Sequence, residues 1–328
     1  MSLTWRQLGD ELRRTDLLVS ATGEAGALTA LTSDSRTVVP GAVYVAVRGS
    51  QADGHRFVPE AVRRGAAAVV VEDAQRAGVP ELVVGDGRRA AIVLARAWHG
   101  DPGRRLRLVG ITGTNGKTTT TALLRHLLNV RGTAGSIGTI GAIDGEGAPV
   151  PSTAGSLTTP GPIDLQGTLA GLLARGVTDV VMEASSHSLD QGRLDGLTFA
   201  AGVFTNVTRD HLDYHGTMAA YLAAKLKLAG TLGATGVEVV CADDDAWHAL
   251  PRGARRLTFG LRPEADVRAC DLVLEARGSR FTLAGRFGSA PLTLPILGDF
   301  NVANALAAAA GAVALGLPPA EVADRLGS

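Results

Sequence analysis

The run Val109-Gly-Ile-Thr-Gly-Thr-Asn-Gly-Lys-Thr-Thr-Thr120 constrains the fold more than any other part of this sequence. An apolar segment, residues 107–111, leads through Gly113 and Gly116 into a segment rich in Leu and Ala, which predicts a strand, a loop and a helix. The spacing is shorter than in the commonest phosphate-binding loop, but small residues still let backbone N–H groups face a polyphosphate. The start of the following helix adds partial positive charge. An exposed lysine in a Gly-rich turn is the alternative, but the combination with Lys117 favours a nucleoside triphosphate.

Composition narrows the class of protein. A chain of 328 residues predicts about two domains. Lys and Arg total 32, as do Asp and Glu, so no net charge favours nucleic acid or an acidic membrane. The two cysteines are far apart in the sequence and predict no disulfide framework. No signal peptide or membrane-spanning run is evident, and we expect a cytoplasmic monomer that binds no nucleic acid and does not insert into a membrane.

Apolar strands alternate with helical segments along most of the chain, which predicts an α/β fold. We expect a small N-terminal α/β domain in residues 1–102, and a doubly wound, mostly parallel-sheet phosphate-loop ATPase domain in residues 103–328. Short alternating strands between residues 257 and 294 predict a β-rich edge. The Gly-rich segment 132–147 shows no strand or helix pattern, and we assign no element to it.

Polar side chains follow two of the predicted buried strands. Glu183 comes directly after Val180-Val181-Met182, where ligands bind in an open parallel sheet. Asp210, His211, Asp213 and His215 follow the next strand, residues 203–205. Two His and two Asp in this position fit a second cation site or substrate contacts, and a polar loop with a capping Asp explains them equally well.

Two further pairs of residues have ordinary explanations on spacing alone. Lys225 and Lys227 lie on a predicted helix, and the pattern favours solvated lysines on its surface. Asn301 and Asn304 could offer the donor and acceptor that an adenine edge needs, although capping of the following helix is an equally good explanation.

Taken in order along the chain, these motifs resemble those of the Mur ligases, the ATP-dependent amide-forming enzymes of peptidoglycan precursor synthesis, and among them the MurE type. Nearly the whole chain takes part in the resemblance. The segments that carry it are Ser33–Arg36 with Pro40-Gly41, Gln51–His55, the phosphate loop, Thr158–Pro160, Glu183–Leu189, Asp210–Gly216, Lys225 and Gly298–Asn301.

The resemblance implies a role for each matching residue. Contacts to the UDP part of a nucleotide-sugar would come from Ser35, Ser50, Gln51 and Ala52. The ATP phosphates would be held by Gly113, Thr114, Asn115, Gly116, Lys117, Thr118 and Thr119, and adenine would be approached by Asn301 and Asn304. The muramoyl-dipeptide would contact Thr158, Thr159, Ser185, Gln191 and Arg193. Mg²⁺ would be bound by Thr118, Glu183, His211 and Lys225, the last as a carbamate, and the catalytic set would be Lys117, Lys225, His211 and Glu183.

The activity implied by the resemblance is addition of the third amino acid to UDP-N-acetylmuramoyl-L-alanyl-D-glutamate through an acyl phosphate. These ligases have a third, C-terminal domain, which we expect to be absent here. Two interpretations are therefore open: the chain is a fragment, or it is a two-domain nucleotide-binding relative without complete catalysis. MurF and folylpolyglutamate synthetase are alternative amide ligases. A simple ATPase or kinase would leave Thr158, Thr159 and Ser185 without a purpose.

Overall fold

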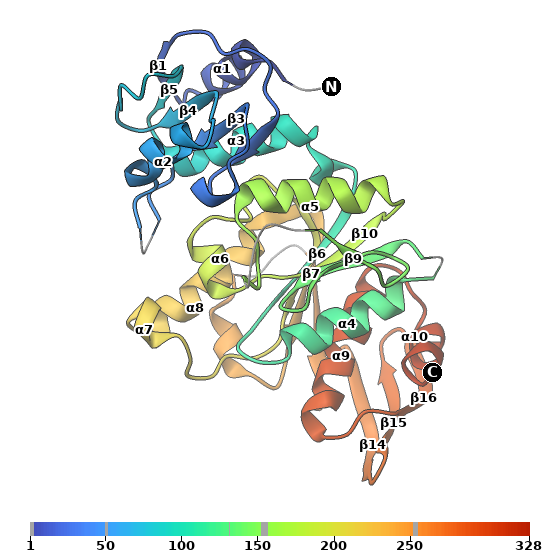
Figure 1. The fold of residues 1–328 in the computed structure, drawn as a ribbon. Helices are drawn as coiled ribbons and strands as arrows, with labels where there is room; N and C mark the ends of the chain where they lie inside the picture. Colours follow the sequence, from blue (N-terminus) through green and yellow to red (C-terminus); the bar gives the residue numbers. More distant parts are fainter. Residues whose placement is uncertain (1–2, 50–51, 131, 152–156, 252–254) are drawn as a thin grey trace. The chain divides into compact units, whose positions relative to one another are not determined.

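The computed structural model describes residues 3–49, 52–130, 132–151, 157–251 and 255–328, which form two compact units (Figure 1). The first unit contains the chain up to Pro102 together with Pro160–Ala170. The second contains most of the chain from Gly103 onward. Within the described residues, no helix is long and apolar enough to cross a membrane.

The first unit is built on a five-stranded sheet in the order β1-β5-β4-β3-β2. Its strands are β1 (Leu18–Thr22), β2 (Ala30–Thr32), β3 (Ala42–Val45), β4 (Ala68–Val71) and β5 (Glu81–Val84). Strands β2 to β5 are parallel, and β1 pairs antiparallel with β5. Alternate side chains of β3 enter different cores: Val43 and Val45 one, Tyr44 the other. The sheet is therefore buried on both faces.

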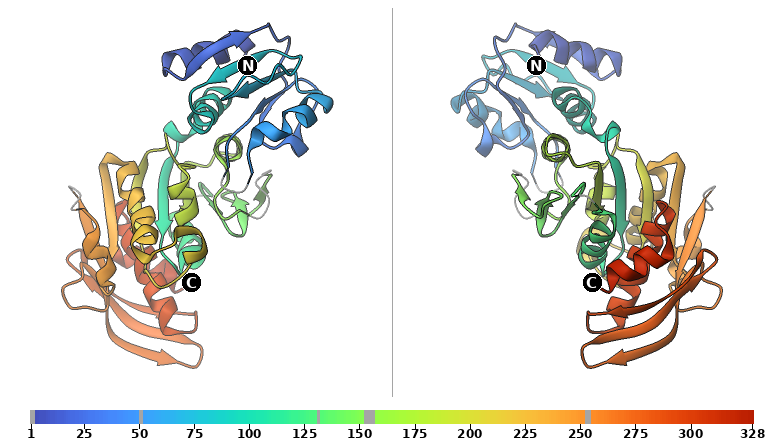
Figure 2. Two further views of the ribbon diagram at one scale, coloured as in Figure 1. Left: turned by 90° about the vertical axis from the view of Figure 1, so that its left-hand side faces the viewer. Right: turned by 90° about the vertical axis from the view of Figure 1, so that its right-hand side faces the viewer.

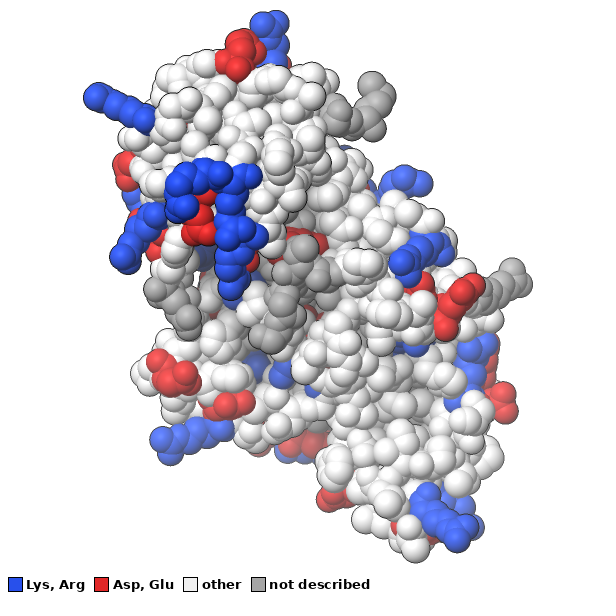
Figure 3. Space-filling view, in the orientation of Figure 1, with Lys and Arg blue, Asp and Glu red and all other residues white. Residues whose placement is uncertain are grey.

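The helices α1 (Trp5–Arg14), α2 (Val58–Arg63) and α3 (Gly87–His99) pack on this sheet. Helices α1 and α3 belong to one core and α2 to the other. Helix α1 begins with a reciprocal cap, in which Thr4 and Gln7 each accept the other's backbone N–H. On the face shown in Figure 3, basic and acidic side chains gather together over this unit rather than forming a surface of one sign.

The second unit is built on an eleven-stranded sheet in the order β16-β15-β14-β13-β12-β11-β6-β10-β7-β8-β9. Its strands are β6 (Arg107–Thr112), β7 (Ala134–Gly138), β8 (Gly141–Ile143), β9 (Pro149–Val150), β10 (Asp179–Glu183), β11 (Phe199–Phe204), β12 (Leu232–Cys241), β13 (Arg256–Gly260), β14 (Val267–Glu275), β15 (Gly278–Gly285) and β16 (Gly288–Leu294).

Strand β6 is central, with β10 and β11 as its parallel neighbours. Strands β14, β15 and β16 form an antiparallel meander, which Figure 2 shows in orange at one end of the sheet. The predicted α/β class, with a mostly parallel sheet and a β-rich edge, is confirmed. Because parallel strands end at the same edge, β6, β10 and β11 deliver their following residues to one place.

The helices of this unit are α4 (Lys117–Leu128), α6 (Ser186–Asp190), α7 (Leu212–His215), α8 (Met218–Leu226), α9 (Asp299–Ala314) and α10 (Pro319–Leu326), and α5 (Pro162–Ala174) is shared with the first unit. Helix α9 is buried from Asn304 to Val313 and packs on α4. Small residues on α9 permit this close packing. At Gly311, for example, a Cβ would lie only 2.9 Å from Leu124 Cδ2.

No element was assigned to the Gly-rich segment 132–147 from the sequence, but the structure has two strands in it. Strand β7 and strand β8 form an antiparallel pair within it. Every residue of β7 is buried. A Cβ at Gly135 would lie 2.9 Å from both the Ile143 carbonyl oxygen and Leu172 Cδ2. Small residues are needed for this close packing, and they removed the apolar pattern by which a strand is recognised.

Candidate functional site

The phosphate loop connects β6 to α4 and depends on two glycines. Gly113 and Gly116 have φ values of 152° and 83°, in the region that favours glycine. A Cβ at Gly113 would lie 1.9 Å from Thr205 Oγ1. A Cβ at Gly116 would lie 2.1 Å from Asn304 Oδ1. The loop therefore fits tightly between the end of β11 and the first turns of α9.

Residues after β11 hold the loop through hydrogen bonds. Asn206 accepts the Thr114 N–H at its carbonyl oxygen (2.7 Å) and the Asn115 N–H at Oδ1 (2.9 Å). Thr205 Oγ1 donates to the Asn115 carbonyl at 2.8 Å. The hydroxyls of Thr114 and Tyr221 lie 3.1 Å apart. No role was predicted for Thr205, Asn206 or Tyr221. The sequence could have indicated Thr205 and Asn206, because they stand at the end of a buried strand that lies next to β6.

Lys117, the first residue of α4, folds back over the loop. Its Nζ donates to the carbonyl oxygens of Gly113 (3.0 Å) and Thr114 (2.9 Å). Burial lowers the pKa of Lys117, while the charges of Glu183 and Asp210 act in the opposite direction. The amine is thus held at the loop, within the site where phosphates were predicted to bind.

Lys225 is buried at the same loop, and the expectation of a solvated lysine was wrong for it. Its side chain is 1% exposed, and Nζ donates to the Gly113 carbonyl at 2.6 Å. The ammonium also lies 4.3 Å from the centroid of the Tyr221 ring. Burial, together with the nearby charge of Lys117, lowers the pKa of Lys225 to about 7, and Asp210 opposes the shift. A poorly solvated amine beside another cation is readily neutral.

Lys227 behaves as the sequence pattern predicted. Its side chain is half exposed and forms an ion pair with Asp190 at 2.7 Å. The two lysines are only two positions apart, but α8 ends at Leu226 and the chain continues in a 3₁₀ turn. Spacing alone could not distinguish them, because both fit a helix surface equally well.

Glu183 ends β10 beside the first turn of α4 and is 1% exposed. Its Oε1 accepts hydrogen bonds from Thr118 Oγ1 (2.9 Å) and from the Thr139 N–H (2.8 Å). Its Oε2 accepts one from Thr139 Oγ1 at 3.2 Å. Thr139, in the β7–β8 turn, was not identified from the sequence, since it lies in the segment to which no element was assigned.

The pair Thr118 and Glu183 fits a magnesium site. A hydroxyl oxygen at the start of a phosphate-loop helix and a strand-end carboxylate are the oxygen ligands that Mg²⁺ takes together with phosphates and water. Among the described residues, no group of three or more His, Cys, Asp or Glu side chains is arranged to hold a metal by itself.

His211 lies in an aromatic cluster next to these residues. It has a φ of 52°, and its ring centroid is 4.8 Å from that of His187 and 6.1 Å from that of Tyr221. Since Lys225 lies over the Tyr221 ring, His211 and Lys225 share this tyrosine as a neighbour. His215 Nε2 lies 3.0 Å from Ser186 Oγ. The segment is more than a capped polar loop, because it packs on α6 and α8.

The residues expected to contact a muramoyl-dipeptide adjoin Glu183. The buried Thr159 Oγ1 donates to the Glu183 carbonyl at 2.9 Å and lies 3.3 Å from Ser185 Oγ. Arg193 donates to the Thr159 carbonyl at 2.8 Å and to Gln191 Oε1 at 2.6 Å. The structure thus places these four residues around the end of β10.

Thr158 and Thr119 occupy the margins of the site. Thr158 Oγ1 lies 3.3 Å from Thr139 Oγ1, which joins Thr158 to the Glu183 network. Thr119 is partly exposed in the first turn of α4.

Asn301 and Asn304 lie on α9 beside the loop. Asn301 Nδ2 donates to the Leu297 carbonyl at 2.8 Å, and Asn304 Nδ2 donates to Asn301 Oδ1 at 3.1 Å. The capping explanation is wrong, because the N-cap residue is Gly298 and no side chain caps the helix. Asn304 instead closes the space beside Gly116.

The residues expected to contact UDP belong to the first unit. Ser35 is buried at the start of a 3₁₀ turn, Ser35–Thr37, with Oγ 3.5 Å from Glu60 Oε2. Ala52 is exposed, and its carbonyl accepts the Gly49 N–H at 2.9 Å. Ser50 and Gln51 lie outside the described residues.

Comparison with known proteins identifies the family. Residues 111–312 match the profile described as "Mur ligase middle domain", and residues 27–100 match "Mur ligase family, catalytic domain". A "UDP-N-acetylmuramoyl-L-alanyl-D-glutamate--2,6-diaminopimelate ligase" from Xanthomonas campestris pv. campestris (strain 8004) is 42% identical over 314 residues, which cover 92% of this chain and 62% of that protein. The chain thus spans about three fifths of the curated relative's length.

Solved structures agree with this result. The structure of a "UDP-N-acetylmuramoyl-L-alanyl-D-glutamate--2,6-diaminopimelate ligase" matches with a TM-score of 0.79 and 30% identity, over 99% of this chain and 66% of that one. A MurF ligase from Thermotoga maritima in complex with ADP matches with a TM-score of 0.66 and 23% identity, over 91% and 65%; this likeness shows the fold. The chain, with its phosphate loop and strand-end Glu183, belongs to the Mur ligase family.

Proposed function

We propose that the protein acts as an ATP-dependent ligase that adds the third amino acid to UDP-N-acetylmuramoyl-L-alanyl-D-glutamate. The observation that carries this proposal is the continuous network from the phosphate loop through Glu183 to Thr159 and Arg193. It joins a nucleotide site to a polar group suited to a second substrate. The amino acid named for the Xanthomonas relative is 2,6-diaminopimelate, and we propose the same one here.

The proposed reaction has two steps. The terminal D-glutamyl carboxylate attacks the γ-phosphorus of ATP, and an acyl phosphate and ADP result. The amino group then attacks the acyl carbon and loses a proton, and phosphate leaves as the amide forms. Splitting the reaction gives the amine a good leaving group to expel.

The residues of this chain have defined tasks in that scheme. Lys117 would leave the carbonyls of Gly113 and Thr114 for the outer phosphates, where its charge offsets the repulsion between carboxylate and polyphosphate. Thr118 and Glu183 would hold Mg²⁺, which supplies further charge neutralisation when bound. Arg193 would keep the polar cluster around Thr159 in place, since it is already bonded to that residue's carbonyl.

The remaining assignments belong to the same proposal. His211 and a carbamate on Lys225 would hold a second Mg²⁺, supported by their shared contact with Tyr221. Asn301 and Asn304 would approach adenine, and Ser35 with residues 50–52 would contact UDP in an N-terminal domain of residues 1–102. Residues 103–328 would bind ATP. We also propose a monomer that acts in the cytoplasm, where its nucleotide-linked substrate would be available.

Binding and trapping experiments test the function. Calorimetric titration of the 328-residue chain with UDP-N-acetylmuramoyl-L-alanyl-D-glutamate, in the presence of Mg²⁺ and a non-hydrolysable ATP analogue, should give saturable binding. The matched ligand without D-glutamate should bind at least about tenfold more weakly, because it lacks the reacting carboxylate. Hydroxylamine added with ATP should trap the acyl phosphate as a hydroxamate. Equal affinity for both ligands, or a preference for the tripeptide form, would exclude the proposed substrate.

A further inference from the structure

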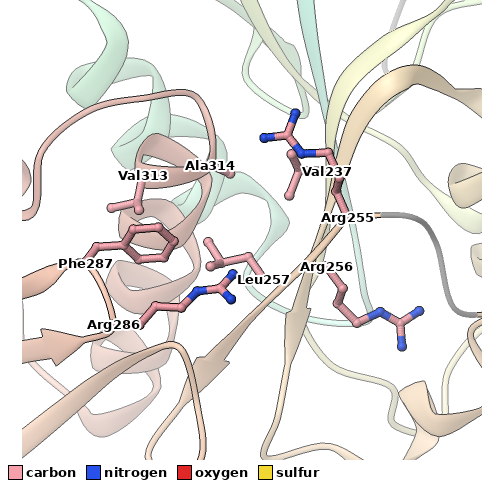
Figure 4. Close-up of a pocket in the computed structure, with 8 residues that line it drawn as sticks. All are labelled: Val237, Arg255, Arg256, Leu257, Arg286, Phe287, Val313 and Ala314. Atoms are coloured by element: carbon pink, nitrogen blue, oxygen red, sulfur yellow. The ribbon is translucent and has the colours of Figure 1, made fainter.

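Strand β13 begins beside a cavity of about 310 Å³ that lies entirely within the second unit. Its walls come from Val237 of β12, Leu257 of β13, Arg286 and Phe287 of the β15–β16 turn, and Val313 of α9 (Figure 4). The phosphate loop follows the carboxyl end of β6, and β12 and β13 run in the same direction as β6. The phosphate loop therefore lies at the carboxyl ends of the parallel strands, and the cavity lies toward their amino ends.

Two arginines face this cavity with unused hydrogen-bonding capacity. Arg255 donates to the Thr235 carbonyl at 3.1 Å and has no ion-pair partner among the residues that the structure describes. Arg286 forms an ion pair with Asp266, in which the closest atoms are Nε and Oδ1 at 3.2 Å. Figure 4 shows these two side chains on opposite sides of the space. Guanidinium groups with free N–H donors match carboxylate and phosphate oxygens.

Arg256 lines the same cavity but is already engaged. It donates to Glu238 at 2.8 Å and to the carbonyls of Leu250 and Pro251 at 3.3 and 2.7 Å. In Figure 4 its guanidinium points away from Arg286. The cationic groups available to a ligand are therefore Arg255 and Arg286.

The remaining wall is apolar and includes an uncovered aromatic ring. Leu257 is buried, whereas Phe287 is 47% exposed. The Arg286 guanidinium carbon lies 4.9 Å from the centroid of the Phe287 ring. A second ring could pack on this pair and cover Phe287.

Three carbonyl oxygens in the last turns of α9 already have hydrogen-bond donors. The carbonyl oxygens of Gly311, Ala312 and Val313 accept N–H groups from Leu315, Gly316 and Leu317. These three oxygens are therefore occupied by the turn that follows the helix.

From these observations we infer that the cavity is a binding site for a small organic anion, with a flat apolar ring and one carboxylate or phosphate group. The anionic group lies between Arg255 and Arg286, and the ring packs against Phe287 and Leu257. The volume is at the lower end of the range for small-molecule sites, which limits the ligand to about one ring system. The site is separate from the proposed ligase reaction.

The probe for this site is 4-iodobenzoate, titrated into the 328-residue chain and followed by calorimetry, with iodine located by anomalous diffraction from soaked crystals. Saturable binding with iodine beside Phe287 is expected. Replacing both cations, Arg255→Ala with Arg286→Ala, should weaken binding at least about tenfold, because charged hydrogen bonds are lost. The neutral isostere 4-iodobenzamide should be weaker by a similar factor.

The control is Arg280→Ala, on β15 outside the cavity, whose side chain is 63% exposed and paired with Glu275. It should bind 4-iodobenzoate as the parent does. All variants replace exposed arginines, so their Tm should match the parent's, which shows that folding is intact. Absence of saturable binding, unchanged affinity in the double variant, or equal binding of 4-iodobenzamide would overturn the proposal. Phenyl phosphate should compete for the site, and competition by inorganic phosphate at equal concentration would refute recognition of the ring.

Discussion

Two glycine-rich segments lie next to the candidate site, and they need glycine for different reasons. In the phosphate loop, Gly116 combines a φ of 83° with a close neighbour, since a Cβ would lie 2.1 Å from Asn304 Oδ1. In the β7–β8 segment, Gly138 has no positive φ, and glycine is required only because a Cβ there would lie 2.2 Å from Glu183 Oε1. The first segment is proposed to bind phosphates through its backbone, and the second makes room for the Glu183 carboxylate.

This difference explains why one segment could be recognised from the sequence and the other could not. A phosphate loop has a fixed order of glycines, Lys117 and Thr118 next to a strand and a helix. Gly135 and Gly138 are needed because of residues distant in the sequence, including Leu172 and Glu183. Such requirements leave no local pattern.

The strongest test of the phosphate loop is Lys117→Ala. We expect loss of on the order of 3 kcal/mol of stabilisation, because one preorganised cation no longer offsets the charge on the phosphates. ATP binding, measured by calorimetry with Mg²⁺, should weaken about a hundredfold or more, and hydroxamate formation should fall in parallel. Lys227→Ala, which removes an exposed ion pair with Asp190, is the matched control and should bind ATP normally. Unchanged ATP affinity in the first variant would contradict the assignment of the loop.

Lys225→Ala tests whether the second buried amine serves the same site. Under the carbamate proposal, Lys225→Ala should reduce hydroxamate formation about tenfold to a hundredfold, because a ligand of the second Mg²⁺ is lost. A short carboxylic acid such as acetate should restore part of the rate to this variant. Lys227→Ala should retain the rate and show no acetate effect. Full activity without Lys225, or acetate rescue in both variants, would sink the proposal.

The pKa of Lys225 predicts a specific pH dependence of stability. Its pKa is about 7 in the folded state and about 10.4 when unfolded. Between these values the unfolded chain binds one more proton, so this residue makes the free energy of unfolding rise with pH, by about 1.4 kcal/mol per unit. Below pH 7 its unfavourable contribution is complete and constant.

Urea unfolding of the parent and of Lys225→Met at pH 7, 8 and 9 measures this dependence. The difference in the free energy of unfolding between the two proteins should change by about 2 kcal/mol in favour of the parent across that range. Lys227→Met serves as the control, and its difference from the parent should stay constant. Parallel pH profiles for the parent and Lys225→Met would show that Lys225 takes up no proton on unfolding. The pKa of Lys225 would then not be lowered in the folded protein.

The elements of the fold could be predicted wherever apolar side chains recur with the period of a strand or a helix. The strand predicted at residues 107–111, the helix predicted after the phosphate loop and the β-rich edge are present as β6, α4 and β13–β16, because each has a pattern that a buried face imposes. The role of Lys225 at the loop was expected only through resemblance, since the spacing of Lys225 and Lys227 in the sequence does not reveal that Lys225 contacts Gly113. Thr139 was indicated neither by side-chain periodicity nor by the resemblance. It follows a strand made largely of small residues, which shows no apolar pattern.

Thr139→Val is the finest test of the comparison between the two segments. It removes the hydroxyl that donates to Glu183 Oε2 while keeping the size of the side chain and the N–H that donates to Oε1. Loss of one of these bonds should cost about 1 kcal/mol of positioning, so the Mg²⁺ concentration that half-saturates ATP binding should rise about fivefold. Thr139→Ser keeps the hydroxyl and should stay near the parent. A role limited to packing would instead lower Tm in the serine variant, which lacks the methyl group, and leave the Mg²⁺ requirement of the valine variant unchanged. That outcome would mean that the β7–β8 segment merely encloses Glu183, whereas the expected one makes it part of the metal site.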